Sequence, residues 1–500
     1  MENKRVTKEL LEKIKGYDNR VPYEGSVPKN EIVRSKIIDS LEEAIKLSGL
    51  EDGMTISFHH HFRSGDKVLP MVMEVLDKMG FKNLRIASSS LTSAHECLVD
   101  YIKKGVVNRI ETSGVRGKLA QGISEGILEY PAVIRSHGGR ARAIVEGDVK
   151  IDVAFLGAPS SDCMGNSNGV VGKSICGSLG YAKVDAHYAN KVIIITDTLV
   201  DYPNYPISIP QTDVDYVVVV DEIGDSSGIM SGATRMTKDP KELLIAKKAL
   251  SAMLASGLFV DGFSMQTGSG GASLAVTKFI REELIKRNIK CSYGLGGITT
   301  YFVQLLEEGL IGSLFDVQSF DLGAAQSLGK NKMHQEISAD FYANPFNCSP
   351  AVDKLDFVIL SALEIDKDFN VNVISGSDGV IRAASGGHSD TAAAAKMSIV
   401  VAPLTRGRLS TILDRVTTIV TPGSTVDVVV TDRGITVNPR RADLKEKFEK
   451  AGLELIDMED LLKAAKDIVG EPKPIEFKNE VVAVVEYRDG SIIDVIKKVK

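Results

Sequence analysis

The sequence contains no tryptophan, and aromatic residues as a whole make up only 6% of its 500 residues. It also contains no basic cluster, and its formal net charge is −6, so we expect no nucleic-acid partner. No apolar run is long enough to cross a bilayer, and the charged N-terminal segment lacks the apolar centre of a secretion signal. These absences predict a cytoplasmic protein with no membrane contact.

Cysteine is also sparse. The sequence has five cysteines, all far apart: Cys97, Cys163, Cys176, Cys291 and Cys348. An odd number without a Cys-x-x-Cys pair argues against a disulfide framework and against a zinc site. We therefore expect a reducing compartment and no bound metal.

The sequence is rich in glycine, at 45 residues, and in short apolar runs. Such runs, alternating with helical patterns like that over 273–287, are typical of buried parallel strands joined by helices. A chain of 500 residues also exceeds what one core usually organises, so more than one domain is expected. The predicted strands cover 54–58, 84–87, 152–156, 192–196, 217–220, 263–267, 290–293, 357–360 and 398–402.

The predicted strands form two sets with one ground plan. An Asp-Gly pair opens each set, at 52–53 and at 261–262. The interval from Gly105 to Asp152 is 47 residues, and the interval from Gly309 to Asp356 is also 47 residues. Matched spacings of this kind indicate two tandem copies of one α/β domain.

The predicted fold class is therefore α/β, with two tandem open α/β domains whose sheets are mostly parallel. The expected boundaries are an N-terminal arm over 1–40, a first domain over 41–235, a second domain over 236–440, and a C-terminal α+β appendage over 441–500. The boundary between the two domains is placed in a stretch rich in Gly, Ser and Thr.

The first candidate site is a glycine loop in the second half. Gly268, Gly270 and Gly271 follow a predicted strand and open a predicted helix. Glycines let a ligand approach the backbone, and the N–H groups of a helix start can bind an anion or an oxyanion. Ser273 occupies the sixth position of the pattern, so the loop lacks the dinucleotide fingerprint. A plain tight turn is the alternative interpretation.

The equivalent place in the first half carries His59, His60, His61, Arg63 and Ser64. In an extended chain the first and third histidines face one way and the second faces the other, so three ligands to one metal are not expected. The functional interpretation is a hydrogen-bonding, cationic loop for a carboxylate, in which the arginine can bind bidentately. The alternative is a set of structural histidines.

Two further glycine runs are candidates. The residues Gly294, Gly296 and Gly297 follow the second predicted strand of the second half and leave room for a thin ligand, or serve only close packing. The run Gly386-Gly387-His388 precedes an Ala-rich helix, where backbone N–H groups could again bind an oxyanion and the histidine could donate or transfer a proton.

These motifs resemble one family over nearly the whole chain. Two tandem open α/β domains are similar to the CoA-transferase superfamily, and the individual motifs resemble its citrate lyase alpha subunits. The motifs that carry the resemblance are His59–Arg63, Gly268–Gly271, Gly294–Gly297, Ser385–Asp390 and the C-terminal run Val484–Gly490.

The resemblance implies an enzyme that transfers an acyl-carrier thiol from acetyl thioester to citrate, releasing acetate. It implies a carrier (gamma) subunit and a lyase (beta) subunit as partners, in an oligomer. It implies no tightly bound cofactor, because the chain would act on the CoA-like prosthetic group of the carrier, or on acetyl-CoA. It places Gly268, Gly270, Gly271, Gly386, Gly387 and His388 in catalysis. It places His59, His60, His61, Arg63 and Ser64 on citrate, and Gly294, Gly296 and Gly297 on the thioester.

One departure from the superfamily bears on mechanism. Ordinary CoA-transferases form a thioester on a glutamate that the resemblance places at, or within about a residue of, Gly296. The sequence has no glutamate between Glu283 and Glu307. We therefore expect a ternary complex and a mixed anhydride. The alternatives are a citramalate lyase alpha subunit, a transferase or hydrolase using Glu222 or Glu336 instead, and a non-catalytic scaffold.

Overall fold

The computed structural model describes residues 6–23, 33–230, 237–268 and 270–500. The chain divides into two units, 1–36 and 37–500. The described part of the first unit contains helix α1 (Lys8–Glu12), whose capping residue Thr7 accepts a hydrogen bond from the Leu10 N–H at 3.1 Å. The boundary predicted at 235–236 between the two α/β domains lies outside the described residues.

The first sheet contains ten strands in the part of the chain that is described. Their order is β1 (Ile37–Ile38), β10 (Tyr216–Val219), β9 (Lys191–Thr196), β6 (Val153–Gly157), β2 (Thr55–Phe58), β3 (Leu84–Ser88), β4 (Val107–Thr112), β5 (Ala132–Ile134), β24 (Phe477–Glu486) and β25 (Ile492–Val499). The neighbouring strands are parallel up to β24, and β24 pairs with β25 antiparallel.

The second sheet contains eight described strands. Their order is β14 (His334–Glu336), β13 (Ile311–Ser319), β12 (Cys291–Ile298), β11 (Met265–Thr267), β15 (Phe357–Ser361), β18 (Met397–Val401), β22 (Val428–Val430) and β23 (Ile435–Val437). The pairs are parallel except β22 with β23. Smaller strands are β7 (Ser160–Ser161), β8 (Ser167–Asn168), β16 (Glu364–Asp366), β17 (Val371–Asn372), β19 (Thr405–Arg406), β20 (Leu409–Ser410) and β21 (Ile412–Leu413).

Both sheets repeat one strand order. The run β10-β9-β6-β2-β3-β4-β5 in the first sheet matches the run β22-β18-β15-β11-β12-β13-β14 in the second. Gly53 and Gly262 stand in matching turns, at φ of 82° and 83°, and their N–H groups bind the carbonyls of Lys82 and Lys290. The duplication predicted from residue spacing is confirmed.

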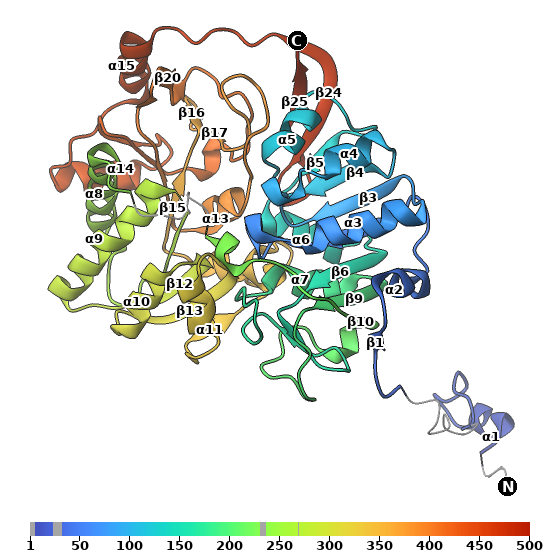
Figure 1. Ribbon diagram of the computed structural model, residues 1–500. Coiled ribbons are helices and arrows are strands. Elements are labelled where there is room, and N and C mark those ends of the chain that lie inside the picture. The colour runs from blue at the N-terminus through green and yellow to red at the C-terminus, as the bar shows by residue number, and fades with distance from the viewer. Residues whose placement is uncertain (1–5, 24–32, 231–236, 269) are drawn as a thin grey trace. The chain divides into compact units, whose positions relative to one another are not determined.

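Helices surround the two large sheets, and many of them pack on the strands (Figure 1). In the first half these are α2 (Leu41–Ser48), α3 (Val68–Met79), α4 (Leu98–Lys103), α5 (Gly117–Ser124), α6 (His137–Val145) and α7 (Gly180–Tyr188). In the second half they are α8 (Pro240–Ala255), α9 (Gly271–Arg287), α10 (Thr300–Glu307), α11 (Leu322–Leu328), α12 (Ala339–Ala343), α13 (His388–Ala394), α14 (Ala442–Lys450) and α15 (Met458–Val469). Short 3₁₀ turns lie at Arg63–Gly65, Ser93–His95, Gln211–Asp213, Ser226–Ile229, Ala351–Lys354 and Gly423–Thr425.

The cores explain why the central strands read as continuous apolar runs. β6 and most of β9 are buried, as are the central strands β15 and β18. A strand covered by helices on both faces has no solvent side, so it needs no polar alternation. Among the described residues no helix combines the length and apolar character required to cross a membrane.

The C-terminal segment is shared between the two sheets. α14 packs near α8 and β23 of the second half, whereas β24 extends the first sheet by pairing with β5. Figure 1 shows this late strand beside elements from early in the chain. The 441–500 segment, predicted as an appendage, therefore links the two halves.

Candidate active site

A cavity of about 550 Å³ lies between the two halves, at the carboxyl ends of the strands. The loops after β2 and β11 both line it, as the repeated plan predicts. The predicted residues on its wall are His60, Arg63, Ser64, Gly268, Gly270, Gly297, Gly386, Gly387 and His388. The predicted residues that do not line it are His59, His61, Gly271, Gly294 and Gly296.

The wall of the cavity is strongly cationic. Among the described residues that line it, Arg63, Arg116 and Arg406 are basic, and none is an aspartate or a glutamate. The whole chain has a net charge of −6, so this concentration of arginine is local. Such a cavity favours an anion with more than one negative charge.

Arg63 lies in the 3₁₀ turn after β2, with a left-handed φ of 53°. Its guanidinium carbon lies 4.2 Å from the centroid of the Phe320 ring, and Nη1 donates to the Ile229 carbonyl at 3.4 Å. Burial, together with the nearby charge of Arg116, lowers the pKa of Arg63 to about 10. The side chain remains cationic at neutral pH.

The three histidines separate as the strand alternation predicts. His60 lines the cavity, and its Nδ1 lies 2.7 Å from Ser89 Oγ. The rings of His59 and His61 are tilted by 43° with centroids 3.7 Å apart, and their nitrogens have no hydrogen-bond partner among the described residues. Burial lowers the pKa of all three, to about 3 for His61. The loop therefore presents neutral imidazole to the cavity, and Arg63 supplies the charge.

The glycine loop before α9 approaches the cavity from the second half. Gly268 already uses its N–H, which donates to the Ile359 carbonyl at 2.7 Å. Gly270 caps α9 without a side-chain hydrogen bond among the described residues, and N–H groups at a helix start are suited to an anion. A Cβ on Gly270 would overlap Ser361 Oγ, which explains the glycine at that position.

The glycine run at 294–297 differs from the prediction, because it lies inside β12 and not after it. Its backbone pairs with β13, and a bulge falls between Gly296 and Gly297. Gly296 has a φ of 102°, and a Cβ there would lie 2.8 Å from the side-chain carbon of Gln266. Gln266 is held in turn by Tyr342, whose hydroxyl lies 2.9 Å from Nε2. A side chain at Gly296 would have to adopt a left-handed backbone and displace Gln266.

Neither displaced glutamate reaches the cavity wall. Glu222 forms an ion pair with Lys67 at 2.5 Å, and its side chain is 50% exposed. Glu336 accepts the Leu179 N–H at 2.6 Å and lies 3.3 Å from the Lys183 amine. These contacts leave the hypothesis of a relocated glutamyl nucleophile without geometric support.

His388 begins α13 with both ring nitrogens engaged. Nδ1 lies 2.7 Å from Thr421 Oγ1, and Nε2 lies 3.1 Å from the Ser361 carbonyl. Burial lowers the pKa of His388 to about 4, so the ring is neutral at physiological pH. This geometry favours holding the Gly386–His388 loop in place over transferring a proton.

Comparison with known proteins decides the family. The model of the family "Citrate lyase, alpha subunit (CitF)" matches residues 34–499. The citrate lyase alpha chain of Haemophilus influenzae is 56% identical over 480 residues, covering 95% of this chain and 96% of that protein. The Escherichia coli alpha chain is 57% identical over 465 residues, covering 93% and 91%.

The chain belongs to the citrate lyase alpha subunit family. A solved structure from Streptococcus mutans, named as an alpha subunit of citrate lyase in complex with citrate, matches with a TM-score of 0.92 and 57% identity. It covers 95% of this chain, and 93% of the solved chain is matched. The transferase class predicted from the motifs is thereby confirmed.

More distant structures share only the fold. A malonate decarboxylase alpha subunit from Acinetobacter baumannii has a TM-score of 0.63 and 16% identity over 89% of this chain and 94% of its own. The two-sheet architecture of citrate lyase alpha subunits therefore also serves other enzymes.

Several cavity residues of this family member were not predicted from the sequence. His137 begins α6, lies 3.1 Å from Ser113 Oγ through Nδ1, and has its pKa lowered by burial to about 3. A signal was present, because Ser136-His137-Gly138-Gly139 has nearly the composition of the run at 385–388. Arg116 and Arg406 each lie two positions before another basic residue, Lys118 and Arg408, and no motif in the local sequence distinguishes them.

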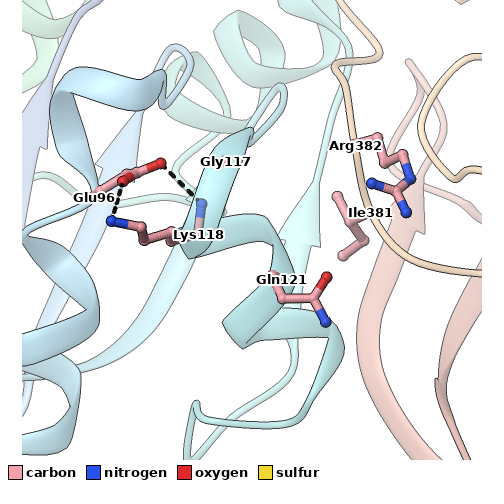
Figure 2. A pocket seen from close by; sticks show the side chains of 6 residues that line it. All are labelled: Glu96, Gly117, Lys118, Gln121, Ile381 and Arg382. Carbon is pink, nitrogen blue, oxygen red and sulfur yellow. Dashed lines mark hydrogen bonds and ion pairs between the residues drawn. The ribbon is translucent and has the colours of Figure 1, made fainter.

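A second cavity, of about 400 Å³, lies at the start of α5 and beside the 381–382 segment. Figure 2 shows Glu96 turned toward Lys118. Glu96 accepts the Lys118 N–H at 3.0 Å and lies 3.4 Å from its amine. Because these charged groups already satisfy one another, the larger cavity remains the candidate active site.

Proposed function

We propose that the cavity between the two halves exchanges acyl partners between citrate and an acetyl thioester, producing citryl thioester and acetate. The observation that carries the proposal is the arginine-lined wall without a carboxylate. Citrate has three carboxylates, so two of them could pair with Arg63 and Arg116 while the third reacts, which an acid with a single charge could not do.

The first half would hold the acid. Arg63 offers a guanidinium beside neutral His60 and Ser64, and Arg116 stands nearby on the same half. A guanidinium can bind a carboxylate bidentately, and the neighbouring hydroxyl and imidazole can fix its orientation. The remaining carboxylate would then point toward the second half.

The second half would hold the thioester. Gly270, Gly297 and Gly387 line the cavity with backbone, and the start of α9, which has no side-chain cap, would supply N–H groups. Each tetrahedral step places negative charge on a carbonyl oxygen, and preorganised N–H groups stabilise that charge.

The chemistry balances without an enzyme nucleophile. A citrate carboxylate oxygen attacks the acetyl carbonyl, the C–S bond breaks, and the thiolate leaves with its electron pair. The thiolate then attacks the citryl carbonyl of the mixed anhydride, the C–O bond breaks, and acetate leaves. Gly296 supports this route, because Gln266 occupies the space that a nucleophilic side chain would need.

The proposal extends to the partners. The thioester would be carried on the CoA-like prosthetic group of an acyl carrier subunit, or supplied as acetyl-CoA, with no cofactor held tightly by this chain. A lyase subunit would cleave the citryl thioester, and the subunits would form an oligomer in the cytoplasm. The five free cysteines of the structure fit a reducing compartment.

Incubation of the isolated chain with acetyl-CoA and citrate tests the proposal. Acetate release that depends on citrate supports it, and citramalate serves as the comparison acid. A faster reaction with citramalate would assign the chain to the smaller acid. If no acetate is released with either acid, the remaining interpretation is that the chain is a non-catalytic scaffold.

A further inference from the structure

Three segments that are far apart in the sequence meet at the edge of the cavity. They are the start of α6, the start of α13, and the turn that follows β24. The His137 N–H donates to the Gly386 carbonyl at 2.8 Å, and both residues line the cavity. The relative position of these two helix starts therefore decides the shape of one cavity wall.

Asp390 joins the two helices. It lies in the first turn of α13 and is fully buried. Its Oδ1 accepts the Ser136 hydroxyl at 2.7 Å, and its Oδ2 accepts the Gly138 N–H at 2.9 Å. One carboxylate thus binds the start of α6 from another helix, where negative charge is favourable.

Arg488 supplies the opposite charge from the C-terminal turn. Its Nε lies 3.8 Å from Asp390 Oδ1, and its Nη2 donates to the Ala343 carbonyl at 3.4 Å. A Cβ on Gly139 would lie 3.3 Å from Arg488 Cα, so this turn packs directly on α6. A buried carboxylate is costly alone, and the arginine compensates its charge.

We propose that Asp390 is a positioning residue for the acyl exchange, which with Arg488 fixes His137 against the Gly386–His388 loop. Asp390 itself does not line the cavity. The inference rests on the proposed function, because it takes the cavity as the place of reaction. It also assigns a role to the C-terminal Val484–Gly490 motif.

Because Asp390 is a buried carboxylate, its protonation should make activity depend on pH. Burial raises the pKa of Asp390 to about 6, although Arg488 and the Gly138 N–H oppose the rise. The other titratable groups that face it are Tyr181, Tyr342 and Tyr487, whose pKa values burial raises, so they stay neutral. As the pH falls through about 6, Asp390 gains a proton and accepts one hydrogen bond less well, and activity should fall.

The decisive variants are Asp390→Asn and Ser136→Ala, with Asp489→Asn as the matched control. Asp489 lies next to Arg488, but it is exposed and bonds only its own turn through Ser491. We expect Asp390→Asn to lower kcat on the order of a hundredfold, since displacement of about 1 Å costs that much. Its activity should also lose the decline near pH 6, while Asp489→Asn keeps both rate and profile.

A double mutant separates positioning from general destabilisation. Ser136→Ala removes the contact with Asp390 and also the cap on the Gly139 N–H at 3.0 Å. It should therefore lower kcat severalfold in the native chain and by a smaller factor in the Asp390→Asn chain, where the shared contact is already altered. Equal effects in the two backgrounds would overturn the proposal, as would an Asp390→Asn chain with native kcat and native acid decline. If Asp390→Asn does not fold, the pH dependence of activity is compared between Ser136→Ala and the control Asp489→Asn. Only Ser136→Ala should change the decline near pH 6.

Hydrogen exchange distinguishes failure of this inference from failure of the proposed function. If the native chain exchanges no acyl group, the proposed function is wrong. The effect of Asp390 on the start of α6 can still be measured by amide exchange. Faster amide exchange over residues 136–139 in Asp390→Asn, without a change over α3, supports the positioning role. Unchanged exchange at the start of α6 overturns it.

Discussion

The loop after β2 and the loop after β11 occupy equivalent places in two sheets of the same strand order, yet their chemistry is opposite. The first carries His60, Arg63 and Ser64, and the second carries Gly268 and Gly270. One loop supplies charge and side-chain hydrogen bonds, while the other supplies open backbone at a helix start. A duplicated domain has thus acquired two unlike walls, and under the proposed function each wall would face one of two unlike substrates.

The largest effect should come from adding a side chain to the glycine loop after β11. In Gly270→Ala the new Cβ overlaps Ser361 Oγ, so the start of α9 must move. We expect kcat to fall roughly hundred- to thousandfold, the range for losing an oxyanion donor. Citrate KM should change little, because the acid binds the other wall. Ser361→Gly in the same chain should recover part of the rate; without recovery, crowding is the wrong explanation.

The charged wall should respond differently. Arg63→Gln removes a charged hydrogen bond, and we expect about 1.5–3 kcal/mol in kcat/KM for citrate, or roughly ten- to hundredfold. The KM for the acetyl thioester should stay within a factor of about two. Arg109→Gln, on β4 and outside the cavity wall, is the control. An equal loss for both substrates would remove the division between the walls.

Arg406 should show the opposite substrate preference to Arg63, with a smaller effect. It lies on the β19–β20 hairpin of the second half, exposed at the cavity, where Nη1 lies 3.4 Å from the Leu363 carbonyl. Arg406→Gln should weaken use of the thioester more than use of citrate, by roughly three- to tenfold, since an exposed charge is screened. Kinetics with each substrate varied in turn measure this. A purely citrate-directed loss would place the cation on the acid side.

The fold was largely predictable from the sequence, because buried parallel strands produce apolar runs and the duplication repeats their spacing. β4 and β13 were not predicted, since both mix apolar with polar residues, such as Asn108 and Asp316. β12 was cut short at Gly294, because glycine in a run normally signals its end, whereas here β13 pairs with the glycine backbone.

The site was only partly predictable. Runs of glycine and histidine are unusual in composition and can be recognised in the sequence, so Gly268, Gly386 and His60 were predicted. Arg116 and His137 reach the cavity only through the packing of α5 and α6, which no local pattern encodes. Likewise Gly296 could be placed near the cavity, but not the Gln266 side chain that fills its space.

The neutral histidines of both walls predict how stability depends on pH. Burial lowers the pKa of His137 to about 3 and of His388 to about 4, whereas both regain an ordinary value when the chain unfolds. The unfolded chain therefore binds more protons below about pH 6.5, so these residues make stability fall as the pH decreases from there. His388→Gln should flatten the decline in melting temperature between pH 6.5 and 5. An unchanged slope would show that this histidine is charged in the folded chain.

The smallest effect is expected for the glutamates outside both walls. Glu222 pairs with Lys67 at the surface, so Glu222→Gln should change the exchange rate by less than about twofold, as is usual for an exposed pair. Acetyl-CoA alone, followed by hydroxylamine and peptide mass spectrometry, should reveal no modified glutamate in the native chain. The kinetics should then require both substrates bound together, because an enzyme-bound intermediate would give ping-pong behaviour. A single glutamate modified in proportion to lost activity would show that one wall carries a nucleophile after all, and the ternary complex would have to be abandoned.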